Sequence, residues 1–360
     1  MVNTMDLDDL QGFRQLDKQN MLAELEGLPD QLQCAWELGL TMPLPNRAAQ
    51  DYACVAISGM GGSAIGADLL AAYVSPTCGM PIIVHRDYGL PAHARGKSTL
   101  FVASSHSGET EETLDGYEAA LRNDCTMIAI TTGGELARRA REHNVPLWQF
   151  KHKGQPRAAV GYSFGLLLAL LFRSKLIPDP TLDLREAVRA MKASQENLRP
   201  ETPAARNPAK RYAGQLMGRW VTVVGAGLLS PVARRLKTQI NEIAKAGANF
   251  EFLPEADHNM LAGTMHPEEV LMPHTMNLFL RAPSDHPRNR KRIDLTKQAL
   301  MLEGLNTDFL DARGRSPLAH MWTLVLFGDY MAYYLAMGYG VDPTPVEALT
   351  TFKEAVKGGK

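Results

Sequence analysis

The sequence predicts an α/β protein with two doubly wound parallel sheets and a helical segment ahead of them. Short apolar runs alternate with longer helical patterns, as is typical of parallel strands joined by crossover helices. A strand pattern, a glycine-rich turn and a helix pattern follow one another at residues 52–73 and again at residues 220–245. Because this order occurs twice in 360 residues, we expect two units of similar design.

The N-terminal segment is expected to be helical. Apolar residues, among them Met21, Leu25 and Leu32, recur at helical spacing between about residues 17 and 40, and Pro29 interrupts the pattern. A proline-rich connector follows. The predicted domains are a helical segment over residues 1–45, a first α/β domain over residues 46–195 and a second over residues 196–360.

The same alternation places the individual elements. Expected strands of the first domain are residues 52–57, 81–85, 99–104, 126–131 and 145–150, with helices at 64–73, 111–122, 135–143 and 161–176. A polar helix is expected within residues 178–207. Expected strands of the second domain are residues 220–224, 270–272, 275–280 and 307–309, with helices at 231–245 and 319–339.

Composition narrows the classes of partner. The 38 Lys and Arg nearly balance 39 Asp and Glu, so there is no general attraction to nucleic acid or to an anionic membrane. The longest apolar run, Gly165–Phe172, is too short for a membrane span, and the N-terminus lacks a secretory signal. The four cysteines form no CxxC pair, which favours a reducing compartment. We therefore expect a cytoplasmic protein without nucleic-acid or membrane partners.

The first candidate site is the glycine-rich turn between Ser58 and Gly66. Glycines let backbone N–H groups approach an anion, and the helix that begins here adds partial positive charge. The turn therefore suits a phosphate group. Gly59-x-Gly61-x-x-Ala64 also resembles a dinucleotide fingerprint, and a tight turn without any ligand is a third possibility.

The second candidate site is the run SHSGET, residues 105–110. It carries several hydroxyl groups where a strand is expected to end and a helix to begin. Hydroxyls and free N–H groups at a helix N-terminus can hold a phosphomonoester without Lys or Arg. A capping box is the alternative, but it accounts for one hydroxyl only. Both loops follow strands, at the edge where open α/β sheets bind ligands.

A carboxylate and an imidazole form the third candidate. Glu242 lies in a helix pattern, and His258 lies in the turn-prone run LPEADHN. Each residue alone is more often a solvated or structural side chain. Facing one substrate, the two would supply a general base and a proton shuttle near neutral pH.

SHSGET resembles the sugar-phosphate motif of the sugar isomerase (SIS) domain. With GMGGSAIG, QPRAAVGYSFG, NEIAK, LPEADHN and GVDPTPVEALTTFK, it makes most of the chain similar to the bifunctional phosphoglucose/phosphomannose isomerase family. The resemblance implies two SIS domains and reversible conversion of glucose 6-phosphate or mannose 6-phosphate into fructose 6-phosphate. It also implies a homodimer whose active sites lie at the interface, with a histidine from the partner, and neither metal nor redox cofactor.

Roles for single residues are likewise implied by the resemblance. Glu242 would be the base, Arg157 would stabilise the enediolate, and His258 would open the sugar ring. Lys353 would assist ring opening, and Thr344 is a candidate for tolerance of the mannose epimer. The residues implied to hold the phosphate are Gly61, Gly62, Ser63, Ser105, Ser107 and Thr110.

Two other functions stay open on the sequence. A regulatory SIS module would bind a phosphosugar without catalysis, and it would leave Glu242, His258 and Arg157 far from the sugar. A dinucleotide-dependent oxidoreductase would use an acidic residue after its second strand, where Asp87 is placed. That second reading leaves SHSGET unexplained.

Overall fold

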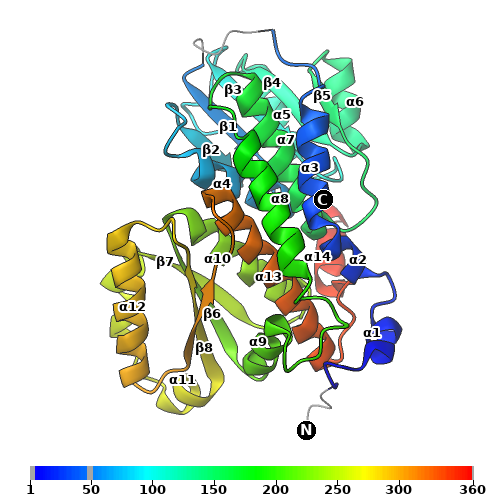
Figure 1. The fold of residues 1–360 in the computed structure, drawn as a ribbon. Coiled ribbons are helices and arrows are strands. Elements are labelled where there is room, and N and C mark those ends of the chain that lie inside the picture. The colour runs from blue at the N-terminus through cyan, green and yellow to red at the C-terminus, as the bar shows by residue number, and fades with distance from the viewer. Residues whose placement is uncertain (1–4, 47–51, 359–360) are drawn as a thin grey trace.

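The computed structural model of the chain describes residues 5–46 and 52–358, and it contains two parallel β-sheets (Figure 1). The first sheet has five strands in the order β2-β1-β3-β4-β5, and the second has four in the order β7-β6-β8-β9. In Figure 1 the first sheet lies in the upper part of the molecule and the second in the lower part, as an α/β fold with two sheets predicts. The exact domain boundaries stay a prediction.

The strands are short and mostly buried. Those of the first sheet are β1 (Cys54–Ser58), β2 (Ile82–His85), β3 (Thr99–Ser104), β4 (Thr126–Thr131) and β5 (Leu147–Gln149). Those of the second are β6 (Trp220–Ala226), β7 (Ala248–Leu253), β8 (Thr275–Arg281) and β9 (Thr307–Asp311). Every pairing is parallel, and β1, β3 and β4 consist almost entirely of buried residues, as strands covered on both faces do.

Helices join the strands and cover the sheets. The N-terminal helices are α1 (Leu10–Leu16), α2 (Met21–Glu26) and α3 (Leu28–Gly39). The first sheet is accompanied by α4 (Gly61–Val74), α5 (Glu111–Arg122), α6 (Gly134–Glu142), η2 (Pro156–Ala158), α7 (Val160–Arg173) and α8 (Thr181–Gln195). The second is accompanied by α9 (Pro208–Leu216), η3 (Gly227–Leu229), α10 (Ser230–Glu242), η4 (Glu255–His258), η5 (Met260–Ala262), α11 (Glu268–His274), α12 (Pro287–Leu302), α13 (Pro317–Tyr339) and α14 (Glu347–Gly358).

The two units share one core. Helix α13 is buried along almost its whole length, and it is apolar on all sides, as a helix enclosed by other elements must be. It packs on α8, α9 and α10, while α4 packs on α7 and α10. Leu236 on α10 and Trp322 on α13 therefore belong to the same apolar cluster as Ile57 in β1 and Phe164 on α7.

Strand order fixes where a ligand can bind. In the first sheet the order reverses between β1 and β3, which pair in register from Cys54–Thr99 to Ser58–Ala103. Open α/β sheets bind ligands at the carboxyl ends of strands at such a reversal. The loops that leave β1 and β3 there are the glycine-rich turn and SHSGET.

One sequence expectation is wrong, and several elements were missed. Residues 270–272 were expected as a strand and instead lie in α11, which follows Pro267 and carries Glu268 and Glu269 in its first turn, both favourable at a helix N-terminus. Strand β7 was missed because it is an edge strand whose apolar residues alternate with Asn249 and Glu251. Helices α9, α12 and α14 were also missed, since they carry many polar residues.

Candidate functional site

The two predicted phosphate loops lie against each other. A Cβ atom on Gly59, directly after β1, would come within 2.8 Å of the carbonyl oxygen of Ser104, the last residue of β3. Only a glycine permits this approach. Helix α4 begins at Gly61, and its N-cap residue makes no side-chain capping hydrogen bond, so N–H groups of its first turn are left without a side-chain acceptor from the cap.

The SHSGET loop presents a network of hydroxyl groups. The Oγ atom of Ser105 lies 2.9 Å from Oγ1 of Thr110 and accepts a hydrogen bond from Gly108 N at 3.1 Å. Ser107 is exposed, and its Oγ accepts from Glu109 N at 3.2 Å. Thr110 is the N-cap residue of α5, but its side chain makes no capping hydrogen bond. The capping-box alternative therefore does not account for these hydroxyls.

Arg157 is brought to the start of α4 by the turn that precedes α7. A Cβ atom on Gly62 would lie 2.4 Å from the carbonyl oxygen of Pro156, so this close packing again requires glycine. The Arg157 side chain is buried, at 6% exposure, and its Nη2 donates to the carbonyl oxygens of Pro343, at 3.2 Å, and Thr344. Its Nε has no hydrogen-bond partner among the described residues. One donor of this buried guanidinium is thus unpaired.

Glu242 faces Arg157 from the end of α10. Its Oε2 lies 3.9 Å from Nη1 of Arg157, and its side chain is 29% exposed, which leaves the carboxylate open to a substrate. Burial lowers the pKa of Arg157, and the carboxylate of Glu242 opposes this effect. The pair joins a carboxylate from the second sheet's unit to a cation from the first.

Two further residues of this cluster come from the second unit. Thr344 is 2% exposed, and its Oγ1 is buried without a hydrogen-bond partner among the residues that the structure describes. Lys245 donates from Nζ to the carbonyl oxygens of Glu242, at 2.9 Å, and Pro343, at 3.1 Å. Desolvation, and then the charge of Arg157, lower the pKa of Lys245 to about 8, although much of its side chain remains exposed.

A buried ion pair supports the turn that carries Arg157. Nη2 of Arg235, on α10, donates to the carbonyl oxygen of Arg157 at 2.7 Å and to both carboxylate oxygens of Asp329, on α13, at 3.1 Å. From the other side, Oε2 of Glu24 accepts a hydrogen bond from Gln155 N at 2.8 Å. Burial raises the pKa of Glu24. The turn that carries Arg157 is thus held by three separate segments.

A histidine pair beside the SHSGET loop was also not predicted from the sequence. Nε2 of His106 lies 2.9 Å from Nδ1 of His152, and the His106 ring packs edge-on against Phe150. Burial, and then the neighbouring imidazole, lower the pKa of His106 to about 4. The position of His106 within the motif could have drawn attention to it, but nothing in the sequence indicated His152.

His258 is not brought to Glu242 within one chain. It ends η4, just after β7, at the carboxyl edge of the second sheet, whereas Glu242 and Asn241 precede the amino end of β7. Six residues of strand separate these edges by about 20 Å. Asp257 anchors the loop through Arg292 and Thr296, both at 2.7 Å, and leaves His258 exposed.

Lys353 forms no bond to the cluster. It lies exposed on α14, and no ion pair or hydrogen bond of its side chain is found among the described residues. Of the predicted site residues, the structure thus brings Arg157, Glu242 and Thr344 together beside the glycine-rich loop, with the hydroxyl loop next to it. His258 lies at the opposite edge of the second sheet from Glu242.

The dinucleotide alternative depends on Asp87. Asp87 is exposed, and its Oδ1 accepts from the backbone N–H of Tyr88 at 2.8 Å. The neighbouring Arg86 turns back onto α4, where it pairs with Asp68. Within residues 5–46 and 52–358, no three His, Cys, Asp or Glu side chains gather as a metal ion would require. None of the helices described has the length and apolar content of a membrane span.

Fold comparison finds a similar arrangement in other proteins of known structure. A glucose-6-phosphate isomerase like protein from Thermus thermophilus is similar over 96% of this chain and 99% of its own, with a TM-score of 0.64 and 21% identity. The C-terminal domain of glucosamine-fructose-6-phosphate aminotransferase from Francisella tularensis covers 91% of this chain with a TM-score of 0.69 and 15% identity. Residues 205–356 match the family described as bacterial phospho-glucose isomerase C-terminal SIS domain. Fold and site together define a protein with two SIS-type units.

Sequence comparison identifies a family within this class of protein. A bifunctional phosphoglucose/phosphomannose isomerase from Caldicellulosiruptor bescii is 39% identical over 336 residues, which are 92% of this chain and 98% of the relative. Another, from Aquifex aeolicus, is 32% identical over 85% of this chain and 91% of its own length. The chain belongs to the bifunctional phosphoglucose/phosphomannose isomerase family, as its motifs had indicated.

Proposed function

We propose that this protein is an aldose–ketose isomerase that interconverts glucose 6-phosphate, mannose 6-phosphate and fructose 6-phosphate. The observation that carries the proposal is the 3.9 Å approach of Glu242 to Arg157 directly beside the glycine-rich loop. A regulatory phosphosugar sensor needs no carboxylate next to a buried cation at its ligand. The named activity of the relatives at 39% and 32% identity supports the same reaction.

The phosphate is expected to lie at the loops of β1 and β3. Hydroxyls of Ser63, Ser105, Ser107 and Thr110 and the N–H groups at Gly61 and Gly62 would donate to its oxygens. In this arrangement no Lys or Arg side chain binds the phosphate. Arg157 remains available for charge that develops at the other end of the sugar.

The proton transfer would be carried by one carboxylate. Glu242 removes the proton from C2 of the open-chain aldose, the electrons move toward the carbonyl oxygen, and an enediolate forms. The same carboxyl group then returns that proton to C1, while the proton of the O2 hydroxyl is transferred to O1, and the ketose results. The fixed charge of Arg157, whose Nη1 faces Glu242, stabilises the enediolate, because a guanidinium stays protonated throughout.

Ring opening is proposed to need a second copy of the chain. His258 and Glu242 lie at opposite edges of the second sheet. A homodimer in which His258 of one copy reaches Glu242 of the other would therefore complete both sites. Lys353, on exposed α14, is expected to assist ring opening, and Thr344 to leave room for the mannose epimer. Hexose 6-phosphate is the only partner besides the second copy that this proposal requires.

Isotope exchange tests the proposal. In Glu242→Gln, exchange of the C2 proton of glucose 6-phosphate with solvent should fall about 100- to 10,000-fold, because the base is lost while the amide keeps the shape of the side chain. Binding of the phosphosugar should change little. Glu255→Gln, an exposed carboxylate at the start of η4, is the matched control and should keep full exchange. Retained exchange in Glu242→Gln would contradict the proposal.

A further inference from the structure

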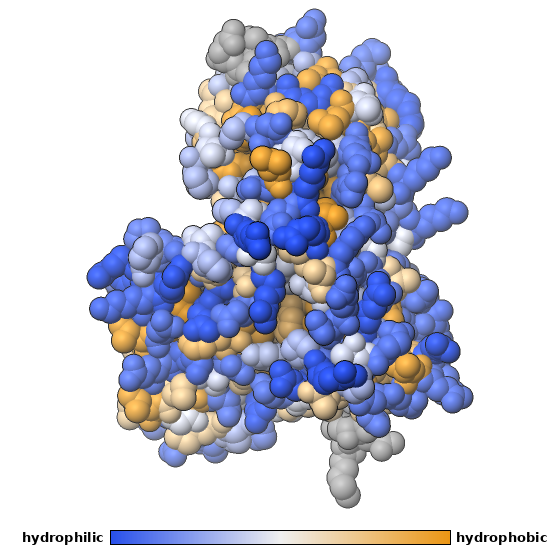
Figure 2. Space-filling model, viewed as in Figure 1, coloured by the Kyte–Doolittle hydropathy of each residue, from blue (hydrophilic) through white to orange (hydrophobic). Residues whose placement is uncertain are grey.

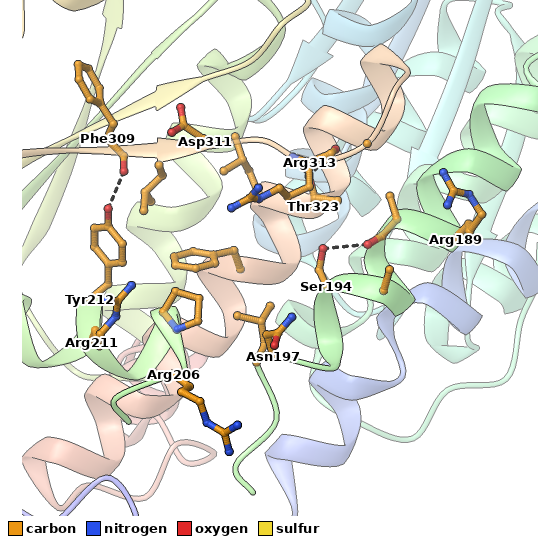
Figure 3. Close-up of a pocket in the computed structure, with 18 of the residues that line it drawn as sticks. Arg189, Ser194, Asn197, Arg206, Arg211, Tyr212, Phe309, Asp311, Arg313 and Thr323 are labelled. Atoms are coloured by element: carbon orange, nitrogen blue, oxygen red, sulfur yellow. Dashed lines mark hydrogen bonds between the residues drawn. The ribbon is translucent and has the colours of Figure 1, made fainter. Parts of the chain in front are cut away.

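A cavity lined by arginines lies away from the proposed isomerase site. It is formed by the second half of α8, the start of α9, the chain after β9 and the middle of α13, with a volume of about 830 Å³ (Figure 3). The isomerase cluster is built instead on α4, η2 and the end of α10. The arginines that line the cavity are Arg189, Arg206, Arg211, Arg313 and Arg315.

Four of these five arginines form no ion pair. Arg189 pairs with Glu186 at 2.6 Å, but the other four guanidinium groups have no ion-pair partner among the described residues. The one carboxylate in the lining, Asp311, is already held by Arg281 through contacts of 2.8 and 3.0 Å. All five arginines are exposed, and those labelled in Figure 3 come from different elements around the cavity. Together they give the cavity a positive potential that favours an anion.

Part of the lining is apolar. Leu310, Leu324 and Phe327 supply apolar surface, and Ala190 and Pro208 add to it. Tyr212 also lines the cavity, and its hydroxyl donates to the carbonyl oxygen of Phe309 at 2.6 Å (Figure 3). A lining that is partly apolar and partly positive matches a ligand that combines an organic body with several negative groups.

We propose that this cavity binds an organic polyphosphate, a small molecule with two or more phosphoryl groups on an apolar or aromatic body. Arginine suits this role because its planar fork donates two parallel hydrogen bonds to phosphate oxygens. The volume lies within the range of cavities that enclose ligands of nucleotide size. A phosphomonoester would engage few of the arginines, so the substrate of the isomerase site is not the expected ligand.

Calorimetric titration of the full chain with ATP, at low salt and without divalent cations, tests the proposal. ATP should bind saturably. Arg313→Ala and Arg206→Ala should each raise its Kd about tenfold or more, since each removes a charge-assisted contact. Arg288→Ala removes an exposed arginine on α12 without an ion-pair partner among the described residues, and it should leave the Kd unchanged. All three variants should keep wild-type isomerase activity without ATP.

Two further titrations identify the site and the ligand class. Ser107→Ala, in the phosphate loop of the isomerase site, should not change ATP binding. Inorganic triphosphate should bind about tenfold more weakly than ATP, because it leaves the apolar part of the lining uncovered. The proposal is overturned if ATP does not bind, if the Kd responds to Ser107→Ala and not to Arg313→Ala, or if triphosphate binds as tightly as ATP.

Discussion

Arg235 and Asp329 form a buried ion pair in which Nη2 of the arginine lies 3.1 Å from each carboxylate oxygen. Both side chains are 1% exposed, and Gln239 donates a further hydrogen bond to Oδ1 of Asp329 at 2.7 Å. Because Arg235 also donates to the carbonyl oxygen of Arg157, the pair ties α13 and α10 to the turn that carries the proposed enediolate-stabilising cation. A charge pair in the core thus positions a residue of the site.

Removing Asp329 should destabilise the protein and displace Arg157. We expect Asp329→Ala to lower the free energy of unfolding by about 3–5 kcal/mol, because Arg235 is left buried and uncompensated. Urea denaturation measures this loss. In the control Asp294→Ala, an exposed partner of Arg281 is lost, and the cost should stay below about 1 kcal/mol. Equal costs for the two variants would contradict the role given to Asp329.

Gly62 should tolerate no side chain. A methyl group there would lie 2.4 Å from the carbonyl oxygen of Pro156, so Gly62→Ala should cost about 1–3 kcal/mol in stability and lower kcat by moving Arg157. Gly79→Ala is the matched control, because a Cβ atom at that position meets no atom within 4 Å. Thermal unfolding and kcat of both variants check the prediction. An unaltered kcat in Gly62→Ala would separate this contact from catalysis.

The hydroxyls of SHSGET should act in binding. Ser107→Ala and Thr110→Ala each remove a donor to a charged phosphate, so KM should rise about 10- to 100-fold while kcat changes less. Steady-state kinetics with fructose 6-phosphate measures both constants. Ser75→Ala, an exposed hydroxyl after α4, should leave both unchanged. A fall in kcat alone would remove Ser107 and Thr110 from the phosphate site.

Two inactive variants should restore activity when they are mixed. Glu242→Gln and His258→Ala are each expected to be nearly inactive. In a mixed dimer one site carries both changes and the other carries none, so random exchange should restore about one quarter of wild-type activity. Activity after co-refolding an equal mixture measures this. If the mixture stays inactive, His258 does not act in the partner's site.

The histidine pair beside SHSGET should make stability depend on acid. The pKa of His106 is lowered to about 4, so between about pH 6.5 and pH 4 the unfolded chain binds a proton that the folded chain does not. The free energy of unfolding should therefore fall as the pH drops through this window. Urea denaturation at pH 7 and pH 5 should show a smaller fall in His106→Gln than in the wild type. His274→Gln, at the exposed end of α11, should match the wild type.

Elements with a strong local pattern were predicted closely from the sequence. The expected strands at residues 99–104 and 126–131 and the helix at residues 111–122 coincide with β3, β4 and α5. Buried parallel strands are continuous apolar runs, which single-sequence patterns reveal. Strand β7 lies at an edge with partly exposed residues, and α12 is amphipathic only weakly, so neither gave a comparable signal.

The supports of the site could not be predicted in the same way. Arg157 contacts the carbonyl oxygens of Pro343 and Thr344, more than 180 positions along the chain. Three further segments supply Glu24, Arg235 and Asp329. In the sequence, nothing distinguishes any of these three from a helix residue without a role in the site. Only the packing of α10 and α13 against α4 and η2 brings these groups together.

The two sheets repeat one strand order, and equivalent helices of the two units are in contact. Helix α4 follows the first strand of its sheet and α10 the first strand of the other, and these equivalent helices pack on each other. Matching helices meet in this way at the twofold axis of a symmetric pair of subunits. The single chain thus holds two units of matching strand order in contact, in a fixed one-to-one ratio. Severing the chain between α8 and α9 should leave two fragments able to reassociate through the faces they already share.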